Sequence, residues 1–226
     1  MIILDNPNEP DFKHIFPTTI LKTIVDPHSY EKISEEIEKS LEIQESYVPS
    51  NRIGNSPYFS NGEETRLQIK NKSVRVNQTP IEANYIADYN IDTLGRYASE
   101  QLKRYINKVY FIPKEILQRL IINSWLADYR DDKTHLLAHQ HEISFINAVY
   151  YHKVNENEGG ELVLYSPNSH LSYMTETHMK IFIKPEPGLL IIFPSWMLHA
   201  VNSFSTESNE RRIAISITCG FDTTDE

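Results

Sequence analysis

The chain has 226 residues, a length that fits one domain or one domain with an elaborated end. Its 40% hydrophobic content is enough for a core, and its 23% charged content is ordinary for a globular protein, which excludes a disordered chain. The net charge of −9 disfavours a broad phosphate-binding surface, so no nucleic-acid partner is expected.

The first half of the chain has the pattern of helices joined by loops. Asp26-Pro27 is a good helix start, because Asp can cap a helix and Pro suits the first helical position. Apolar residues then recur at helical spacing, namely Tyr30, Ile33, Ile37 and Leu41. The polar stretch 51–62 indicates a surface loop. A second helix is predicted from Thr79-Pro80 to about Ile106, and Pro113 begins a short third segment.

From about residue 119 the pattern changes to short segments rich in Ile, Val, Phe and Tyr, separated by Gly, Pro, Asn and Ser. The predicted strands are 121–129, 143–153, 161–165, 179–184, 189–194, 199–204 and 212–221. This spacing favours a β-sandwich or jelly roll, with the preceding helices packed on one sheet. We therefore expect an α+β fold and a single domain, 1–226. In it, 1–118 would be a helical and loop support region and 119–226 the core that carries the site.

The last predicted strand has two different faces. Side chains alternate along a strand, so its isoleucines share one face and its small or polar residues the other. The isoleucines are Ile213, Ile215 and Ile217, and the other face holds Arg212, Ala214, Ser216 and Thr218. The first face is apolar enough to lie under helices, and the second is suited to line a cavity.

The chain also carries information about its compartment. Its single cysteine, Cys219, permits no disulfide within the chain, which fits a reducing compartment. The first residues lack a basic segment followed by a long apolar stretch, and the densest apolar run, 189–193, is too short to cross a bilayer. We expect a soluble, cytoplasmic protein without membrane contact.

Three histidines form the most informative pattern. His139 and His141 lie two residues apart, so an extended segment would place both on one face and turn Glu142 the other way; His199 follows sixty residues later. Imidazole is a ligand for iron, zinc or copper, and the usual mononuclear iron site has two histidines and one carboxylate. The predicted metal ligands are His139, His141 and His199. A carboxylate such as Glu142 remains an alternative to His141.

The motifs around these histidines resemble those of the iron(II)/2-oxoglutarate-dependent dioxygenase superfamily. More narrowly, they resemble its viral and bacterial branch of "putative 2OG-Fe(II) oxygenases", which carries His-x-His, Val-Tyr-Tyr and Phe-Pro-Ser-Trp-Leu-x-His. Phe16-Pro17-Thr18 and Trp125 also match this branch. The motifs, in order, are His139-Gln140-His141, Val149-Tyr150-Tyr151, Gly159-Gly160-Glu161-Leu162, Phe193-Pro194-Ser195-Trp196-Met197-Leu198-His199 and Arg212-Ile213-Ala214-Ile215-Ser216.

The resemblance implies a double-stranded β-helix core that binds Fe(II), with 2-oxoglutarate as co-substrate and O2 as oxidant. It implies that His139 and His199 are iron ligands, and that His141 stands where most relatives have aspartate. It also implies that Arg212 binds the distal carboxylate of 2-oxoglutarate with the help of Tyr151.

The residues themselves add to this assignment. A guanidinium pairs well with a carboxylate, and Arg212 lies on the polar face of its strand, whereas Arg211 shares the isoleucine face. Asn147 has the same strand parity as Tyr151. The resemblance further implies a small hydroxyl residue two positions after the arginine, where this chain has Ala214, and Ser216 is the next candidate on that face. Arg212, Tyr151, Asn147 and Ser216 are therefore the predicted 2-oxoglutarate ligands.

The expected activity is an oxidation, most simply the hydroxylation of an unidentified protein side chain or small molecule with release of succinate and CO2. One alternative is a cupin-type metalloenzyme that does not use 2-oxoglutarate. Gly188, Pro194 and His199 fit cupin spacing, but no Glu lies three to five residues after His141, and Arg212 would have no task. A second alternative is a non-catalytic binding module on the same fold. Nothing in the sequence predicts the oligomeric state.

Overall fold

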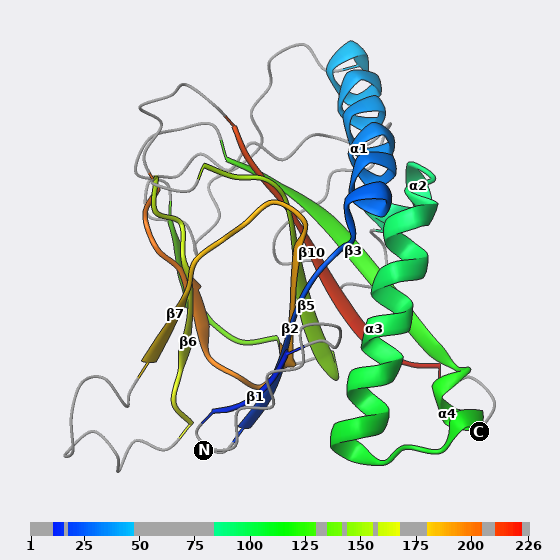
Figure 1. The fold of residues 1–226 in the computed structure, drawn as a ribbon, viewed down its shortest axis with the longest axis vertical. Coiled ribbons are helices and arrows are strands. Elements are labelled where there is room, and N and C mark those ends of the chain that lie inside the picture. The colour runs from blue at the N-terminus through cyan, green and yellow to red at the C-terminus, as the bar shows by residue number, and fades with distance from the viewer. Residues whose placement is uncertain are drawn as a thin grey trace.

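The computed structural model describes residues 11–15, 18–47, 84–129, 135–141, 144–155, 158–167, 180–204 and 211–222. In these residues a four-stranded sheet faces a six-stranded sheet, and two long helices lie against the other side of the larger sheet (Figure 1). The site candidates all belong to the two sheets and the links between them.

The larger sheet has the order β1-β2-β8-β5-β10-β3, and the smaller sheet has the order β4-β9-β6-β7. Every pair of neighbouring strands in these two sheets is antiparallel. The larger sheet is built from β1 Asp11–Ile15, β2 Thr18–Ile24, β8 Leu189–Pro194, β5 Ile146–Lys153, β10 Arg212–Phe221 and β3 Leu120–Tyr129. The smaller is built from β4 Leu136–His139, β9 His199–Val201, β6 Leu162–Tyr165 and β7 Lys180–Ile183. This is the jelly-roll core that the sequence predicted.

The predicted strands after residue 119 are confirmed to within a few residues, but three strands were missed. The first half was expected to consist mainly of helices and loops, but it also contains β1 and β2, which form one edge of the larger sheet. β2 is rich in Thr and Ile, as strands often are, but no strand was predicted before the helix that starts at Asp26. β4 was missed because four residues that end at His139 give too short a pattern.

The described helices are α1 Pro27–Tyr47, α2 Tyr85–Asp88, α3 Asp92–Tyr110 and α4 Lys114–Leu117. The Asp26 carboxylate accepts a hydrogen bond from the Ser29 backbone N–H at 3.0 Å, which confirms the predicted start of α1. Pro113 precedes α4 as predicted.

The prediction of one helix from Thr79 to about Ile106 is wrong in its first part. Asn90 adopts a left-handed conformation with φ of 55°, and this residue separates α2 from α3. Asparagine tolerates this conformation better than most residues, so the break is a local property of the sequence. Thr79-Pro80 itself lies outside the described residues.

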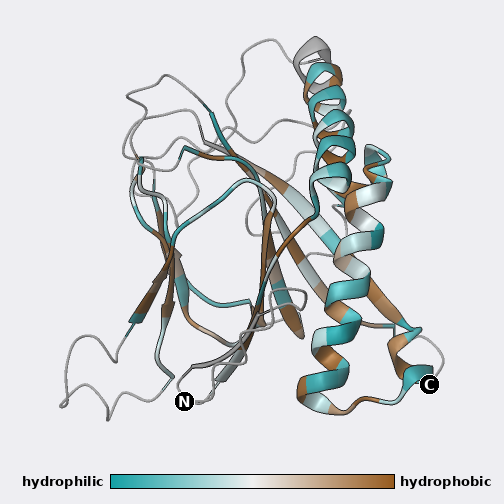
Figure 2. Cartoon of the chain, in the orientation of Figure 1, coloured by the Kyte–Doolittle hydropathy of each residue, from teal (hydrophilic) through white to brown (hydrophobic). Residues whose placement is uncertain are grey.

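The outer face of the larger sheet and the helices share one hydrophobic core. Ile33 and Ile37 of α1 and Leu94 and Leu102 of α3 belong to the same buried cluster as alternate residues of the central strands. The strand residues in this cluster are Ile146, Ala148, Tyr150, Leu190, Ile192, Ile213, Ile215, Ile217 and Cys219. Apolar positions recur along both helices between hydrophilic ones (Figure 2).

A second cluster fills the space between the two sheets. It joins Tyr151, Phe193 and Ala214 of the larger sheet to Leu162 and Leu164 of the smaller one. The alternation predicted for the last strand is therefore confirmed. Its isoleucines face the helices, and the face that begins with Arg212 looks into the sandwich.

None of the described helices is long and apolar enough to cross a bilayer.

Replacement of Ile37 tests how much the helix layer contributes to stability. Ile37 is fully buried, and Ile37→Ala is expected to lower the free energy of unfolding by about 2–4 kcal/mol because it leaves a cavity. Ile43 lies on the same helix but is 40% exposed, so Ile43→Ala should cost less than about 1 kcal/mol. Urea denaturation measures both, and equal losses would contradict the packing described here.

Candidate active site

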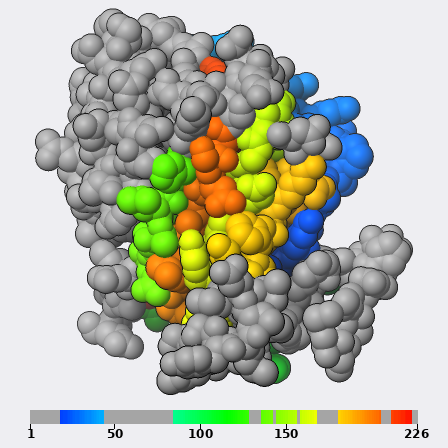
Figure 3. All heavy atoms as spheres, turned by 90° about the vertical axis from the view of Figure 1, so that its left-hand side faces the viewer, coloured from blue at the N-terminus to red at the C-terminus, as the bar shows by residue number. Residues whose placement is uncertain are grey.

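Two neighbouring strands of the smaller sheet bring together histidines that are far apart in the sequence. His139 is the last residue of β4, His199 is the first of β9, and the antiparallel register pairs them directly. Figure 3 views this side of the molecule, where the green segment around β4 lies beside the orange segment around β9. Cross-strand partners on one face have neighbouring side chains, so the pairing itself creates a two-histidine site.

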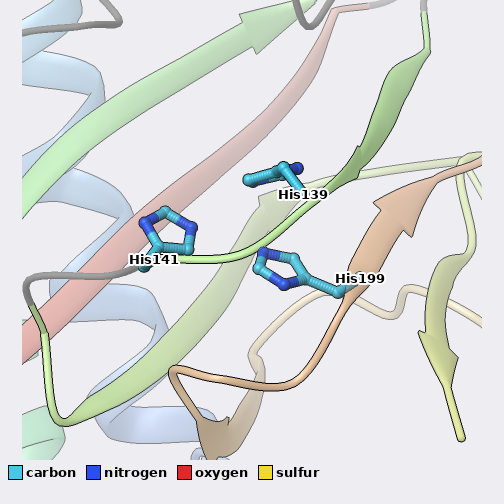
Figure 4. A group of neighbouring side chains, drawn as sticks. All are labelled: His139, His141 and His199. Atoms are coloured by element: carbon cyan, nitrogen blue, oxygen red, sulfur yellow. The ribbon is translucent and has the colours of Figure 1, made fainter. Parts of the chain in front are cut away.

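His141 completes the cluster from the link that follows β4. One nitrogen from each of His139, His141 and His199 lies within 4.8 Å of the other two, and Figure 4 shows the three rings gathered together. The paired strand β4 ends at His139, so His141 follows in the link rather than in the strand itself. The expected proximity nevertheless holds, with 5.1 Å between the two ring centroids.

Two of the histidines are held in a defined tautomer. His139 Nδ1 lies 2.9 Å from the Leu137 carbonyl oxygen, and His199 Nδ1 lies 2.9 Å from the Met197 carbonyl oxygen. A carbonyl only accepts hydrogen bonds, so each Nδ1 must carry the proton and donate. In the neutral ring each Nε2 is therefore the unprotonated nitrogen, the arrangement typical of metal-ligating histidines.

The surroundings keep the three rings neutral. Burial lowers the pKa of His141 to about 4, with a smaller contribution from repulsion by His139. Burial and repulsion from the other two rings hold the pKa of His199 well below its ordinary value, and burial also lowers that of His139. At neutral pH the cluster thus offers three uncharged imidazoles, and this donor set fits a divalent transition metal.

Glu142 is the carboxylate alternative to His141 as the third metal ligand. Glu142 lies outside the described residues. Within the described part of the chain, the only group of three or more potential ligands that could hold a metal consists of histidines alone. His141 therefore remains the predicted third ligand.

Arg212 and Tyr151 form a second polar group on the inner face of the larger sheet. The Arg212 side chain is only 5% exposed, and its Nη2 donates a hydrogen bond to the Gly160 carbonyl oxygen at 3.1 Å. The guanidinium carbon lies 5.5 Å from the centroid of the Tyr151 ring. Burial raises the pKa of Tyr151, and the charge of Arg212 partly opposes this rise. A fixed cation beside a neutral phenol suits a carboxylate ligand.

Gly160 makes the position of Arg212 possible, a role that the sequence did not reveal. Gly159 and Gly160 both have positive φ, a conformation that glycine adopts readily. In addition, a Cβ on Gly160 would lie 2.7 Å from Arg212 Nε. The glycine is thus required both for its conformation and for the close approach of the guanidinium.

Part of the inner face of the larger sheet is accessible to solvent. Ser216 of β10 pairs with Val149 of β5, and both side chains are partly exposed although they lie on central strands. Their neighbours on the helix side, Tyr150 and Ile215, are fully buried. Solvent therefore reaches the inner face of the larger sheet at the predicted position of Ser216.

Asn147 has the same strand parity as Tyr151 but lies far from it along β5. It is four residues from Tyr151, which corresponds to about 14 Å at the rise of an antiparallel strand. It pairs with Phe193, whose ring centroid lies 4.9 Å from that of His199, and its Oδ1 accepts a hydrogen bond from Ser144 Oγ at 2.9 Å. Asn147 thus belongs to the histidine end of the sandwich, and Arg212 and Tyr151 to the other.

Comparison with known proteins agrees with this geometry. Residues 123–218 match the family model described as "Putative 2OG-Fe(II) oxygenase". No curated protein sequence matches the chain. The match spans the strands that carry the histidines and Arg212.

Solved structures show the same fold. A Pseudomonas putida prolyl-4-hydroxylase shares 12% identity at a TM-score of 0.52, covering 90% of this chain and 92% of its own. A Trichoplax adhaerens prolyl hydroxylase, solved with a peptide fragment of hypoxia inducible factor, shares 16% identity at 0.54, covering 91% and 83%. The epimerase SnoN from nogalamycin biosynthesis, solved with Fe3+ and alpha-ketoglutarate, shares 12% identity at 0.53, covering 92% and 82%.

The resemblance found in the sequence is confirmed at the level of the superfamily. The family match covers residues 123–218, and the solved structures share the fold of the chain. The match names Fe(II) and 2-oxoglutarate as the cofactor and co-substrate of that family, and the three-histidine cluster could hold a metal ion.

A methyl group at position 160 tests the packing around Arg212. Gly160→Ala is expected to destabilise the fold by about 1–3 kcal/mol, because alanine is strained at positive φ and its Cβ would displace the guanidinium. Gly220→Ala is the matched control, since no atom lies within 4 Å of a Cβ at that position. Thermal unfolding of the two variants provides the measurement; an unchanged Gly160→Ala protein would refute the close contact.

Proposed function

We propose that this protein is an iron(II)- and 2-oxoglutarate-dependent oxygenase that holds Fe(II) with His139, His141 and His199, binds 2-oxoglutarate with Arg212 and Tyr151, and hydroxylates a protein side chain or small molecule. The observation that carries the proposal is the convergence of three neutral imidazoles at one end of the sandwich, with a buried arginine on the inner face of the opposite sheet. Bound iron and 2-oxoglutarate would supply the oxidising chemistry, in which O2 is consumed and succinate and CO2 are released.

Charge explains why these two groups suit the same ligand. Three neutral imidazoles leave a divalent ion with its full charge, so an anionic co-ligand is favoured. 2-Oxoglutarate carries two carboxylates, one to neutralise the metal and one to pair with Arg212. Because Arg212 is buried, its pairing with a carboxylate is weakly screened by solvent.

The remaining predicted ligands take different parts in this proposal. Tyr151 lies against the guanidinium, and its hydroxyl would donate to the same distal carboxylate. The Ser216 hydroxyl lies on the same face of β10 and would contact the co-substrate along its length. Asn147, at the histidine end, would contact the part of the co-substrate nearest the metal rather than its distal carboxylate.

The rest of the chain would hold the two sheets in place. We assign residues 1–118 to support and 119–226 to the core within one domain, with α1 and α3 on the outer face of the larger sheet. A cupin-type reaction without 2-oxoglutarate would leave no task for the buried Arg212, so the buried arginine favours the oxygenase.

Metal and co-substrate binding can be followed without knowledge of the primary substrate. Anaerobic addition of Fe(II) and then 2-oxoglutarate should produce a visible charge-transfer absorption, and exposure to air should then yield succinate. Zn(II) is the control, because it has no redox chemistry and should give no such band. His199→Ala should lose the band with the metal. A fully iron-loaded protein that gives neither band nor succinate would contradict the proposal.

The two adjacent arginines allow a sharp test of the carboxylate anchor. Arg212→Gln should weaken 2-oxoglutarate binding about 100-fold, or about 2.7 kcal/mol, because a buried charge-assisted pair is lost. Metal affinity should stay within about threefold, since Arg212 belongs to the other group of residues. Arg211→Gln removes the same charge one position earlier and should change neither value by more than about twofold. The idea fails if both variants lose the same co-substrate affinity.

A further inference from the structure

We propose that Trp125 is the positioning residue for His141, and that its indole keeps this imidazole in the orientation at which it joins His139 and His199 on the metal. The inference rests on the proposed metal site and extends it to a residue outside the ligand set. It follows from a difference between the three histidines.

His139 and His199 are each oriented by a hydrogen bond from Nδ1 to the carbonyl oxygen two residues earlier. Both also lie at the ends of paired strands (Figure 4). His141 lies in the link beyond β4, and only its backbone N–H is held, by the Ser195 carbonyl oxygen at 3.2 Å. Within the described residues, no hydrogen bond orients the His141 ring. A ligand that is not oriented lowers metal affinity, so another contact must restrict this ring.

Ring packing provides that restriction. The Trp125 and His141 centroids lie 5.8 Å apart with an angle of 32° between the rings, and the His141 and His199 rings are stacked at 5.2 Å and 11°. These distances are typical of favourable offset contacts between flat rings. The His199 ring is itself fixed by its own hydrogen bond, which leaves Trp125 as the contact from outside the cluster.

Trp125 is well placed to act as a fixed support. It lies in the middle of β3, which pairs with β10 along ten residues, and it is opposite Ser216 on the inner face of the larger sheet. Trp125 is partly exposed, as are Ser216 and Val149, so it lies in the solvent-accessible part of the inner face. β3 is an edge strand of the larger sheet, and its pairing with β10 along ten residues holds the backbone that presents the flat Trp125 ring to the ligand beyond the end of β4.

The chain has only two tryptophans, and the other one is a natural control. Trp196 lies in the link before His199, is 47% exposed, and makes no ring contact with the three histidines in the described part of the chain. Gln140 Nε2 donates a hydrogen bond to the Trp196 backbone carbonyl oxygen at 2.7 Å, and a substitution of the Trp196 side chain retains this bond.

Co(II) binding tests the positioning role in the full-length protein. Trp125→Met keeps bulk but removes the flat ring, and it should weaken Co(II) affinity about tenfold and shift the visible Co(II) spectrum toward that of His141→Ala. Trp125→Phe restores an aromatic ring and should bind within about threefold of the original protein. Trp196→Met should match the original protein in both affinity and spectrum.

Tryptophan fluorescence separates failure of this inference from failure of the proposed metal site. In Trp196→Phe protein the emission comes from Trp125 alone, and Co(II) bound beside His141 should quench it, whereas Zn(II) should not. Co(II) that binds without quenching lies elsewhere, which would overturn the proposed site and this inference together. Quenching combined with unchanged affinity and spectrum in Trp125→Met would overturn the inference alone. Equal impairment of Trp125→Phe and Trp125→Met would also overturn it, because the aromatic ring would then not be the cause.

Discussion

Strand β10 is paired with β3 on one side and with β5 on the other, so each of its side chains is committed to one face of the larger sheet. Its isoleucines are enclosed by the helix-side core, and Arg212 is directed between the sheets. A shift of one residue would exchange these sets, burying the guanidinium among the helices and exposing isoleucines to the inner space. The large cost of that exchange fixes the register, and the same register places Arg212 beside Tyr151 and Ser216 beside Val149.

The two ends of the sandwich differ in charge. The histidine end is neutral because burial disfavours protonation of its rings, whereas the other end holds a buried cation. A metal ion would add positive charge at the neutral end. The site would then have two positive ends separated by a partly exposed stretch of strand, an arrangement complementary to a short dicarboxylate.

Sequence reasoning succeeded where one element alone determined the answer. The capping Asp26, the spacing along α1 and the alternation of β10 are local patterns, and the structure agrees with them. It could not show contacts that depend on a distant partner. His139 and His199 were expected together as metal ligands, but the pairing of β4 with β9 that joins them was not predicted, because the four residues of β4 give too short a pattern. The contact of Gly160 with Arg212 joins residues fifty-two positions apart, so its glycine could be interpreted only as a turn.

The place of His141 shows how such a site can depart from a histidine–carboxylate set without losing its geometry. A carboxylate can be oriented by hydrogen bonds to either oxygen, whereas an imidazole needs its plane fixed as well as its direction. His139 and His199 obtain this from backbone carbonyls, because the strand ends hold those carbonyls in place. Within the described residues the hydrogen bond of His141 itself is the one from its backbone N–H to Ser195, so the plane of its ring must be set by another flat surface. Trp125 presents that surface from a central position in β3, where pairing with β10 already holds the backbone. Through Trp125, the larger sheet thereby orients His141, the one proposed ligand that does not lie on a strand of the smaller sheet.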